Sequence, residues 1–559
     1  MFIKDAPRYG YRGVMVDVSR NFHGKKSILK LMDAMAMYKM NKIHLHLSDD
    51  EGWRLEIPGL EELTGFGGKR CHDTSICLAP ELGSGATTQT SGTGYLTVQD
   101  YKEILKHAKE LHIEVIPEFD MPGHSRAAIK AMEYRFNKFN PSTNQTVRDK
   151  ADKYLLSEPG DTSQYLSIQM FRDNALNPCL NSTYNFVQHV LLTLIDIHKD
   201  ISPLKVFHAG GDEVATGAWI NSSACQYLIA HNSRIGSVKD LKEYFVAKLS
   251  NITSKYQVDL AAWEDGLIQD KKVFDRENLT NSNVFGYAWD NVWEWGAFNR
   301  PYLLANSGYK TVMCQATHLY FDMPYEPDPE ERGLYWATRY TDTQKTFGFL
   351  PDNLYANDKE DRLGKPLTEK QLCEKFACPT LNKSSNIIGM QAHIWSETVR
   401  TEDQLFYMLF PRVLAVAERS WHKASFENGP ANKKELRNVQ WKTFANILGH
   451  KELGRLDDMG INYRVPLPGA KVEAGKLIAK SAFPGLKIEY KTDDRKDWQQ
   501  YTSEVKVAGK LISLRTKSAN GRRSSRELSV NIPTSSGYYC AHSMSFQVIM
   551  VFIGIFAAF

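Results

Sequence analysis

The heptapeptide HAGGDEV at residues 208–214 constrains the fold more than any other part of the chain. It follows the mostly apolar run 204–207, so a short buried strand ends here in two glycines and two carboxylates, Asp212 and Glu213. Glycines at such an end let backbone and ligand approach closely. Most Asp-Glu dipeptides lie in solvated loops, but the strand and the glycines before this one favour a functional site.

Seven further apolar runs look like strands, and most are separated from the next by segments of helical periodicity or by long loops. The predicted strands, with the run before HAGGDEV included, are 13–19, 42–48, 113–119, 204–211, 258–263, 283–289, 310–316 and 386–394. The predicted helices are 27–40, 97–111, 185–198, 238–256, 298–307 and 403–421. Eight strands alternating with helices predict an α/β protein built on a TIM (β/α)8 barrel, whose functional residues cluster where the strands end.

The chain's composition excludes some classes of function. Its 69 Lys and Arg nearly balance 65 Asp and Glu, for a net charge of +4. Apart from a short cluster near Arg522 and Arg523, no dense basic run is interleaved with aromatics, so nothing indicates a nucleic-acid partner. Many of the 11 tryptophans stand at predicted strand ends. That placement suggests stacking against a ligand, although tryptophan more often belongs to the core.

Two features indicate passage through the secretory pathway. Six Asn-X-Ser/Thr acceptor tripeptides begin at Asn144, Asn181, Asn221, Asn251, Asn278 and Asn382. Cysteines also occur in short-range pairs, Cys71 with Cys77 and Cys373 with Cys378, while Cys179 and Cys225 flank the central motif. We expect disulfides, because neither short pair is accompanied by a zinc-ligand set. Cys314 lies in an apolar strand and is predicted to be a buried thiol.

The two ends of the chain differ. Residues 1–8 contain no apolar stretch of the kind a signal peptide needs, so we expect the sequence to be truncated at its front. Residues 544–559 are almost all apolar and follow a polar spacer at 535–537. This tail fits a GPI-attachment signal, and a simple membrane helix or an aberrant terminus are the alternatives. The expected location is the secretory pathway, that is, extracellular, cell-surface or lysosomal.

Seven segments, in order and spacing, resemble the catalytic domain of family 20 glycoside hydrolases, most nearly the chitobiase-type β-N-acetylhexosaminidases. The segments are RGVMVDVSRNF, HLHLSDDEGWRLEI, IEVIPEFDMPGHSRA, HAGGDEV, AAWEDG, YFDMPYE and QAHIWSE. The resemblance covers about residues 8–460. From about 466 to 530 the chain changes to short alternating strands, similar to the small immunoglobulin-like domain of chitobiases. The expected domains are therefore 1–460, 461–535 and a hydrophobic tail at 536–559.

The resemblance implies a retaining, substrate-assisted hydrolysis of terminal β-linked N-acetylglucosamine or N-acetylgalactosamine. Adjacent strand residues point to opposite sides, so Asp212 and Glu213 cannot straddle one bond as the acid and the nucleophile of an ordinary retaining glycosidase. In the implied reaction the sugar's own 2-acetamido oxygen attacks the anomeric carbon. Glu213 is the general acid and later the base. Asp212 holds the acetamido N–H, and Tyr320 donates its hydroxyl to the attacking oxygen.

The resemblance also assigns substrate-binding residues. Trp263, Trp289 and Trp395 would wall the acetamido pocket, and the alternative is that all three belong to the core. Arg20 would bind the O3 and O4 hydroxyls, or else form a surface salt bridge. Asp322 and Glu397 would complete recognition at O4 and O6, and Trp336 would be a platform for the second sugar. These contacts favour a closed pocket, which implies exo cleavage from the non-reducing end.

A second set of residues is expected to support the catalytic residues. His124 and Asp49 look like the family's pair that orients Glu213, although either alone could be merely structural. Asp50, Asp120 and His208 also lie inside the motifs, where they contact the substrate or only brace the mouth through hydrogen bonds. No metal and no organic cofactor is implied.

Two rival functions are considered. The first is a carbohydrate-binding or cell-recognition glycoprotein that keeps the pocket without turnover; the intact Asp212-Glu213 pair argues against it, because binding alone needs no poised acid. The second is a chitinase of the family that carries a D-x-x-D-x-D-x-E strand, and the sequence contains no such string.

Overall fold

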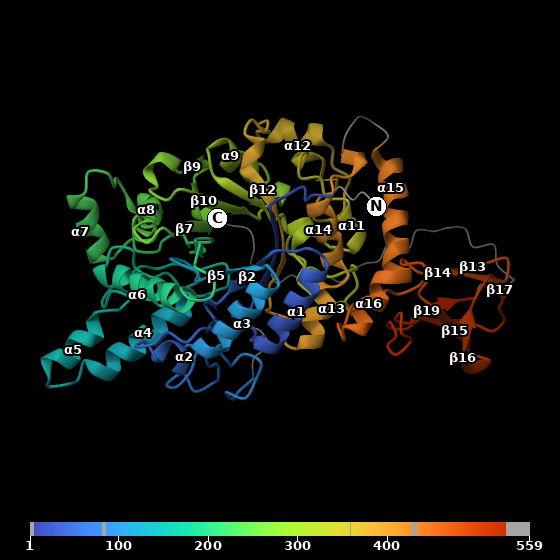
Figure 1. Ribbon diagram of the computed structural model, residues 1–559, viewed down its shortest axis with the longest axis horizontal. Coiled ribbons are helices and arrows are strands. Elements are labelled where there is room, and N and C mark those ends of the chain that lie inside the picture. Colours follow the sequence, from blue (N-terminus) through green and yellow to red (C-terminus); the bar gives the residue numbers. More distant parts are fainter. Residues whose placement is uncertain (1–4, 81–84, 358, 428–432, 533–559) are drawn as a thin grey trace. The chain divides into compact units, whose positions relative to one another are not determined.

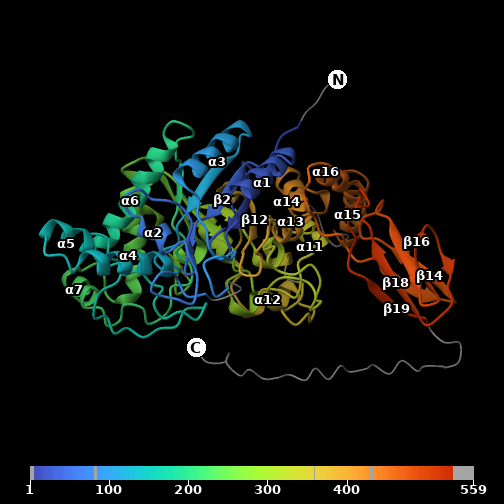
Figure 2. The same ribbon diagram turned by 90° about the horizontal axis from the view of Figure 1, so that it is seen from below.

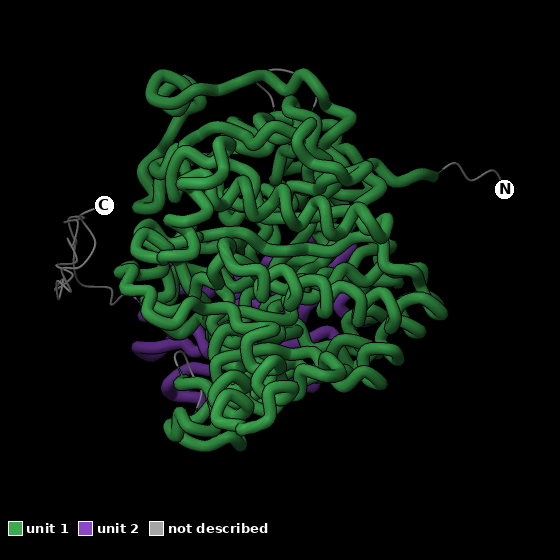
Figure 3. Tube along the Cα trace, turned by 90° about the vertical axis from the view of Figure 1, so that its left-hand side faces the viewer, with its two compact units in different colours: residues 1–444, 455–464 green, residues 445–454, 465–559 purple. Residues whose placement is uncertain are grey.

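A computed structural model describes residues 5–80, 85–357, 359–427 and 433–532. The chain divides into two compact units (Figure 3). Unit 1 comprises residues 1–444 and 455–464, and unit 2 comprises residues 445–454 and 465–559. The predicted hydrophobic tail at 536–559 lies outside the described residues. Among the residues that the structure does describe, no helix is both long and apolar enough to span a bilayer.

Unit 1 is built on a closed barrel of eight parallel strands, in the order β1-β12-β11-β10-β7-β6-β5-β2. This confirms the predicted (β/α)8 barrel. Each strand lies within or near a predicted apolar run, because a strand buried on both faces needs apolar residues throughout. The strands are β1 Tyr11–Asp17, β2 Lys42–His46, β5 Glu114–Glu118, β6 Val206–His208, β7 Asp259–Trp263, β10 Val284–Ala288, β11 Lys310–Met313 and β12 Ile387–Ile394.

Helices surround these strands within unit 1 (Figures 1 and 2). The predicted single helix at 403–421 is wrong. The structure has two helices there, because Pro411 has no N–H to continue the first of them. The longer helices are α1 Lys25–Met37, α3 Val98–Glu110, α4 Arg126–Phe139, α6 Asn181–His198, α8 Leu241–Ser254 and α14 Arg412–Trp421. Shorter ones are α2 Glu62–Gly65, α5 Gln145–Asp152, α7 Ser223–His231, α9 Arg300–Asn306, α10 Ala316–Leu319, α11 Thr343–Phe347, α12 Glu369–Lys375 and α13 Glu402–Leu409. Helices α15 Lys433–Ile447 and α16 Leu453–Asp458 follow.

Buried polar side chains occupy part of the barrel's interior. Glu118, at the end of β5, has Oε2 2.9 Å from His44 Nε2 and 2.6 Å from His46 Nδ1. The Nε2 atom of His46 lies 2.9 Å from Asp49 Oδ2. Burial opposes protonation of His46, but the charges of Glu118 and Asp49 outweigh it and raise its pKa to about 10. A chain of charged hydrogen-bonding groups therefore leads from inside the barrel to Asp49 at its mouth.

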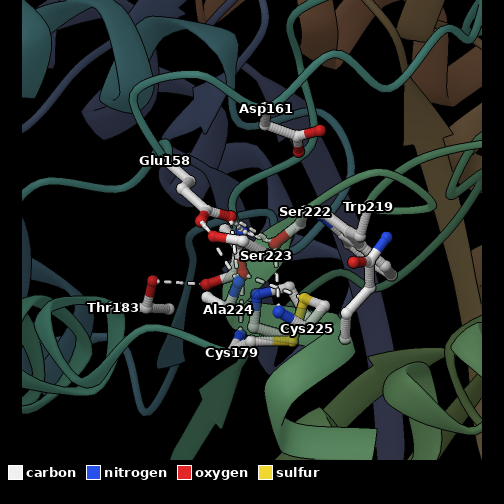
Figure 4. Close-up of a disulfide and its surroundings, with 12 residues drawn as sticks. Glu158, Asp161, Cys179, Thr183, Trp219, Ser222, Ser223, Ala224 and Cys225 are labelled. Carbon is white, nitrogen blue, oxygen red and sulfur yellow. Dashed lines mark hydrogen bonds between the residues drawn. A yellow bond between two sulfur atoms is a disulfide. The ribbon is translucent and has the colours of Figure 1, made fainter.

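Three disulfides confirm the expected pairings: Cys71–Cys77, Cys179–Cys225 and Cys373–Cys378. Cys179–Cys225 joins the segment before α6 to helix α7 (Figure 4). Beside it, the Glu158 carboxylate accepts hydrogen bonds from the hydroxyls of Ser222 and Ser223 at the start of α7. Cys314 is a buried free thiol, as predicted. The Cys179–Cys225 disulfide and the Glu158 hydrogen bonds therefore tie the long excursion between β5 and β6 to helix α7.

Over its described residues, up to 532, unit 2 is all-β apart from residues 445–454, as the change in pattern predicted. One antiparallel sheet contains β13 Gly469–Glu473, β14 Lys476–Lys480 and β17 Val505–Lys506. The other contains β16 Arg495–Tyr501, β15 Ile488–Thr492, β18 Leu511–Thr516 and β19 Leu528–Asn531. Alternate residues of these strands, among them Leu477, Ile512 and Leu514, form a small apolar core.

Candidate active site

The carboxylate pair lies in a sharply turned segment after β6. Gly210 and Gly211 have φ angles of 66° and 97°, a region that glycine tolerates and other residues avoid. A Cβ at Gly210 would lie 1.8 Å from Asp120 Oδ1, and one at Gly211 would lie 3.1 Å from Gly266 Cα. The glycines of the motif are therefore needed both for the turn and for close packing. They place Asp212 in a buried position, whereas the side chain of Glu213 keeps 29% of its surface exposed.

His124 connects this pair to the predicted Asp49 and Arg20. Its Nε2 lies 3.3 Å from Glu213 Oε2 and 3.7 Å from Asp212 Oδ2, and its Nδ1 lies 3.3 Å from Asp49 Oδ1. Arg20 contacts Asp49 Oδ2 at 2.7 Å. Burial lowers the pKa of His124, but Asp49 and Asp212 together hold it well above its usual value. His124 is thus an imidazolium that faces the carboxyl groups of both Asp212 and Glu213.

Asp212 is a carboxyl group that resists ionisation. Burial raises its pKa to about 7, with Asp265 and Glu213 adding to the rise and His124 opposing it. Asp120 adjoins it and accepts a hydrogen bond from Gly211 N at 3.0 Å. Burial and the charge of Asp212 raise the pKa of Asp120 well above its usual range. The two carboxyls therefore do not both ionise easily in the free protein.

Asp212→Asn is expected to stabilise the fold increasingly as pH rises. The unfolded chain loses this proton near pH 4, whereas the native state holds it to about pH 7, so stability falls across that window. Asn does not titrate, so the difference in unfolding free energy between variant and wild type should grow by ~1–3 kcal/mol from pH 4.5 to 7.5. Thermal melts at each pH measure it as a widening gap in Tm. Asp270→Asn, at a side chain 67% exposed, is the control. A gap that stays constant with pH would contradict this account.

The predicted aromatic residues do converge. Trp263 lies 5.7 Å from Trp395 between ring centroids, and Tyr320 lies 6.5 Å from Trp289 and 6.1 Å from Trp395. Trp336 packs edge-on against both Tyr320 and Trp289 at 5.9 Å. Trp263, Trp289 and Tyr320 belong to one buried cluster in the barrel's interior, and the partly buried Trp336 and Trp395 pack against it. The rings therefore belong to the core, as the alternative interpretation had it, and their place at the mouth is also compatible with the predicted role as pocket walls.

The predicted sugar-binding groups bear polar atoms that are buried and make no hydrogen bond among the described residues. They are Arg20 Nε, Asp212 Oδ1, both carboxylate oxygens of Asp322, and Glu397 Oε2. Burial raises the pKa of Glu397 to about 7 although Arg20 opposes it, and burial with Glu397 raises the pKa of Asp322 well above its usual value. Buried polar atoms are nearly always satisfied in proteins, so a ligand rich in hydroxyl and amide groups fits this mouth.

The three motif residues whose role was left open have structural partners. Asp50 accepts hydrogen bonds from Arg126 N and Asn174 Nδ2. Asp120 braces the glycine turn, and His208 packs at 4.9 Å against Trp263 inside the barrel. All of these contacts are made to other protein groups, which favours the bracing role over contact with the substrate.

Sequence reasoning missed Asp265, the third residue of the WEDG string. Its Oδ2 accepts a hydrogen bond from Glu213 N at 2.7 Å, and its Oδ1 accepts one from Trp289 Nε1 at 3.1 Å. A carboxylate directly after a predicted strand was the signal that could have identified it.

Comparisons with known proteins identify the family of the chain. Residues 9–424 match the catalytic domain of glycosyl hydrolase family 20, and residues 452–527 match the chitobiase/beta-hexosaminidase C-terminal domain. A beta-hexosaminidase of Vibrio vulnificus is 43% identical over 93% of this chain, and an N,N'-diacetylchitobiase of Vibrio harveyi is 41% identical over 94%. The chain spans 62% and 63% of those two proteins, less than two thirds of each.

A solved structure has the same architecture. It is the GH20 exo-β-N-acetylglucosaminidase of Vibrio harveyi in complex with N-acetylglucosamine, with a TM-score of 0.61 and 29% sequence identity. The similarity covers 82% of this chain and 60% of that one.

Proposed function

The chain belongs to glycosyl hydrolase family 20, and on that basis we propose that it is an exo-acting β-N-acetylhexosaminidase. It would remove terminal, non-reducing β-linked N-acetylglucosamine or N-acetylgalactosamine from chitooligosaccharides or glycoconjugates. One observation carries the proposal. A buried carboxyl (Asp212) and a partly exposed one (Glu213) face the same imidazolium at a mouth lined by unpaired polar atoms. In that arrangement Glu213 can donate a proton, and Asp212 can stabilise a positive charge on the substrate.

The proposed reaction uses the substrate's own acetamido group as the nucleophile. Its carbonyl oxygen forms a bond to the anomeric carbon while the glycosidic C–O bond breaks and the Glu213 carboxyl gives its proton to the leaving oxygen. Asp212 accepts the acetamido N–H and faces the positive charge of the oxazolinium ion that results. Glu213, now a carboxylate, removes a proton from water as that water opens the ring at the anomeric carbon. Two displacements at one carbon retain its configuration.

The remaining residues position the sugar. Tyr320 donates its hydroxyl to the acetamido oxygen, and the surrounding tryptophan walls exclude water from the reacting centre. Arg20 is fixed by Asp49 and lies 4.9 Å over the ring of Trp395, so its guanidinium is held rigidly for sugar hydroxyls. Asp322 and Glu397 offer acceptors for the remaining hydroxyls, and Trp336 is a platform for the next sugar.

The proposal is tested with chitotriose labelled at its reducing end. An exo-acting enzyme releases unlabelled N-acetylglucosamine first and leaves labelled chitobiose. Labelled monosaccharide as the first product would contradict exo action, and binding without any turnover would favour the silent carbohydrate-binding protein.

Glu397→Gln is expected to raise KM for N,N'-diacetylchitobiose about 10-fold or more, with a smaller effect on kcat. The amide keeps the shape of the side chain but loses a charge that would accept a sugar hydroxyl. Glu402→Gln is the matched control, because Glu402 is paired with Lys30 and Ser27 and is not one of the predicted substrate-binding residues. Steady-state kinetics measure both variants, and equal KM values would contradict a sugar contact for Glu397.

We further propose that the protein passes through the secretory pathway. All six acceptor asparagines are exposed, as glycan attachment requires, and three disulfides are consistent with an oxidising compartment. Loss of mass on treatment of the cell-derived protein with an N-glycan amidase tests this proposal; an unchanged mass would contradict it.

A further inference from the structure

Asp265 joins two parts of the mouth that the sequence separates widely. It lies in the turn Glu264–Gly266 directly after β7. One carboxylate oxygen accepts the backbone N–H of Glu213 at 2.7 Å, and the other accepts the indole N–H of Trp289 at 3.1 Å. A single side chain therefore holds the backbone of the predicted acid and one wall of the acetamido pocket.

Glu213 needs such an anchor because of its backbone. Its φ angle is 49°, a conformation that residues other than glycine, asparagine and aspartate rarely adopt. A backbone held in this region returns to an ordinary conformation unless its surroundings fix it. A hydrogen bond from its own N–H to a carboxylate is a direct way to fix it.

Asp265 is itself held in place. Trp263 N donates to Gly210 O at 2.9 Å, and a Cβ at Gly266 would lie 3.1 Å from that same oxygen, so the two turns are in backbone contact. From the outer side, Lys242 Nζ of α8 donates to the carbonyl oxygens of Asp265 and Ile268, at 2.5 Å and 3.1 Å. The turn that carries Asp265 is thus clamped between the glycine turn and helix α8.

We propose that Asp265 is a positioning residue that aims the Glu213 carboxyl at the leaving oxygen and couples its position to the Trp289 wall. This inference rests on the proposed function and adds a residue to it. It does not require Asp265 to touch substrate. Its effect on kcat/KM belongs to protonation of the leaving group, because kcat/KM reports the first displacement, in which Glu213 must point its proton at the leaving oxygen.

This role predicts a dependence on the leaving group that a merely structural role does not. A dinitrophenolate departs without a proton, whereas a sugar oxygen needs one. Asp265→Asn keeps the size of the side chain but replaces one acceptor by a donor, so it cannot accept from both Glu213 and Trp289. We expect kcat/KM for N,N'-diacetylchitobiose to fall about 10- to 100-fold. The value for 2,4-dinitrophenyl N-acetyl-β-glucosaminide should change much less.

The ratio of the two losses is the test, because both substrates are assayed on one preparation and a partly unfolded sample lowers both rates equally. Trp289→Phe removes the indole donor but leaves the bond to Glu213, so it should lower both rates by a similar factor. Asp270→Asn, at an exposed carboxylate paired with Lys239, should change neither. Equal losses on both substrates in Asp265→Asn, or no loss on chitobiose, would overturn the inference. If wild-type protein cleaves both substrates and Glu213→Gln is selective for the activated one, the proposed function stands whatever Asp265→Asn does.

Discussion

Glu213→Gln is expected to lower kcat/KM for N,N'-diacetylchitobiose by about 10²- to 10⁴-fold, the range that a positioned acid contributes. The glutamine side chain has nearly the same volume and can still lie beside His124, but it has no proton to give to the leaving oxygen. KM should change little, because Glu213 binds the substrate no more strongly than its amide does. Steady-state kinetics with chitobiose measure the loss.

The internal control is a leaving group that needs no proton. Cleavage of 2,4-dinitrophenyl N-acetyl-β-glucosaminide by Glu213→Gln should retain most of its wild-type rate in the first displacement, seen as a burst of phenolate. Full chitobiose turnover by the variant would contradict the assignment of Glu213. Equal inactivity of variant and wild type on both substrates would favour the silent carbohydrate-binding protein.

Asp212→Ala is expected to lower kcat by about 10²- to 10³-fold, as the loss of one preorganised electrostatic group does. The wild-type carboxylate orients the acetamido N–H and faces the charge of the oxazolinium ion, and both contacts are strongest in the transition state. Asp212 lies 3.7 Å from His124 and is buried, so water cannot effectively take the place of its charge in the alanine variant. The kcat of the purified variant measures the effect.

Asp212→Asn separates charge from shape. It retains a side chain that can reach the acetamido group, so a loss in kcat close to that of alanine assigns the effect to charge. A rise in KM without a fall in kcat, in either variant, would contradict a role in the transition state.

The barrel was predictable because its strands are continuous apolar runs, each closed by a polar or aromatic motif. The motif at 208–214 predicted where the candidate site lies for a similar reason: two glycines and two carboxylates after a buried strand are typical of the mouth of a barrel. Helix boundaries were harder. The periodicity of 403–421 continues through Pro411, and the break depends on one missing N–H that periodicity does not register.

The parts of the site that sequence reasoning missed depend on three-dimensional contacts. Asp265 and Glu213 are 52 residues apart in the sequence. The hydrogen bond between them uses the backbone N–H of Glu213, so the residue type at that position gives no sign of it. The positive φ of Glu213 is likewise invisible, since the residue itself is not a glycine. The buried chain from Glu118 through His46 to Asp49 was readable only as separate polar residues at strand ends.

The most direct test of the central claim replaces the acetyl group of an aryl N-acetyl-β-glucosaminide by mono-, di- and trifluoroacetyl groups. Each fluorine makes the carbonyl oxygen a weaker nucleophile while changing the size of the group little. If the sugar supplies the attacking atom, kcat/KM must fall steeply with each added fluorine. Rates that stay level across the series would show that the nucleophile comes from the protein or from water, and would contradict the account.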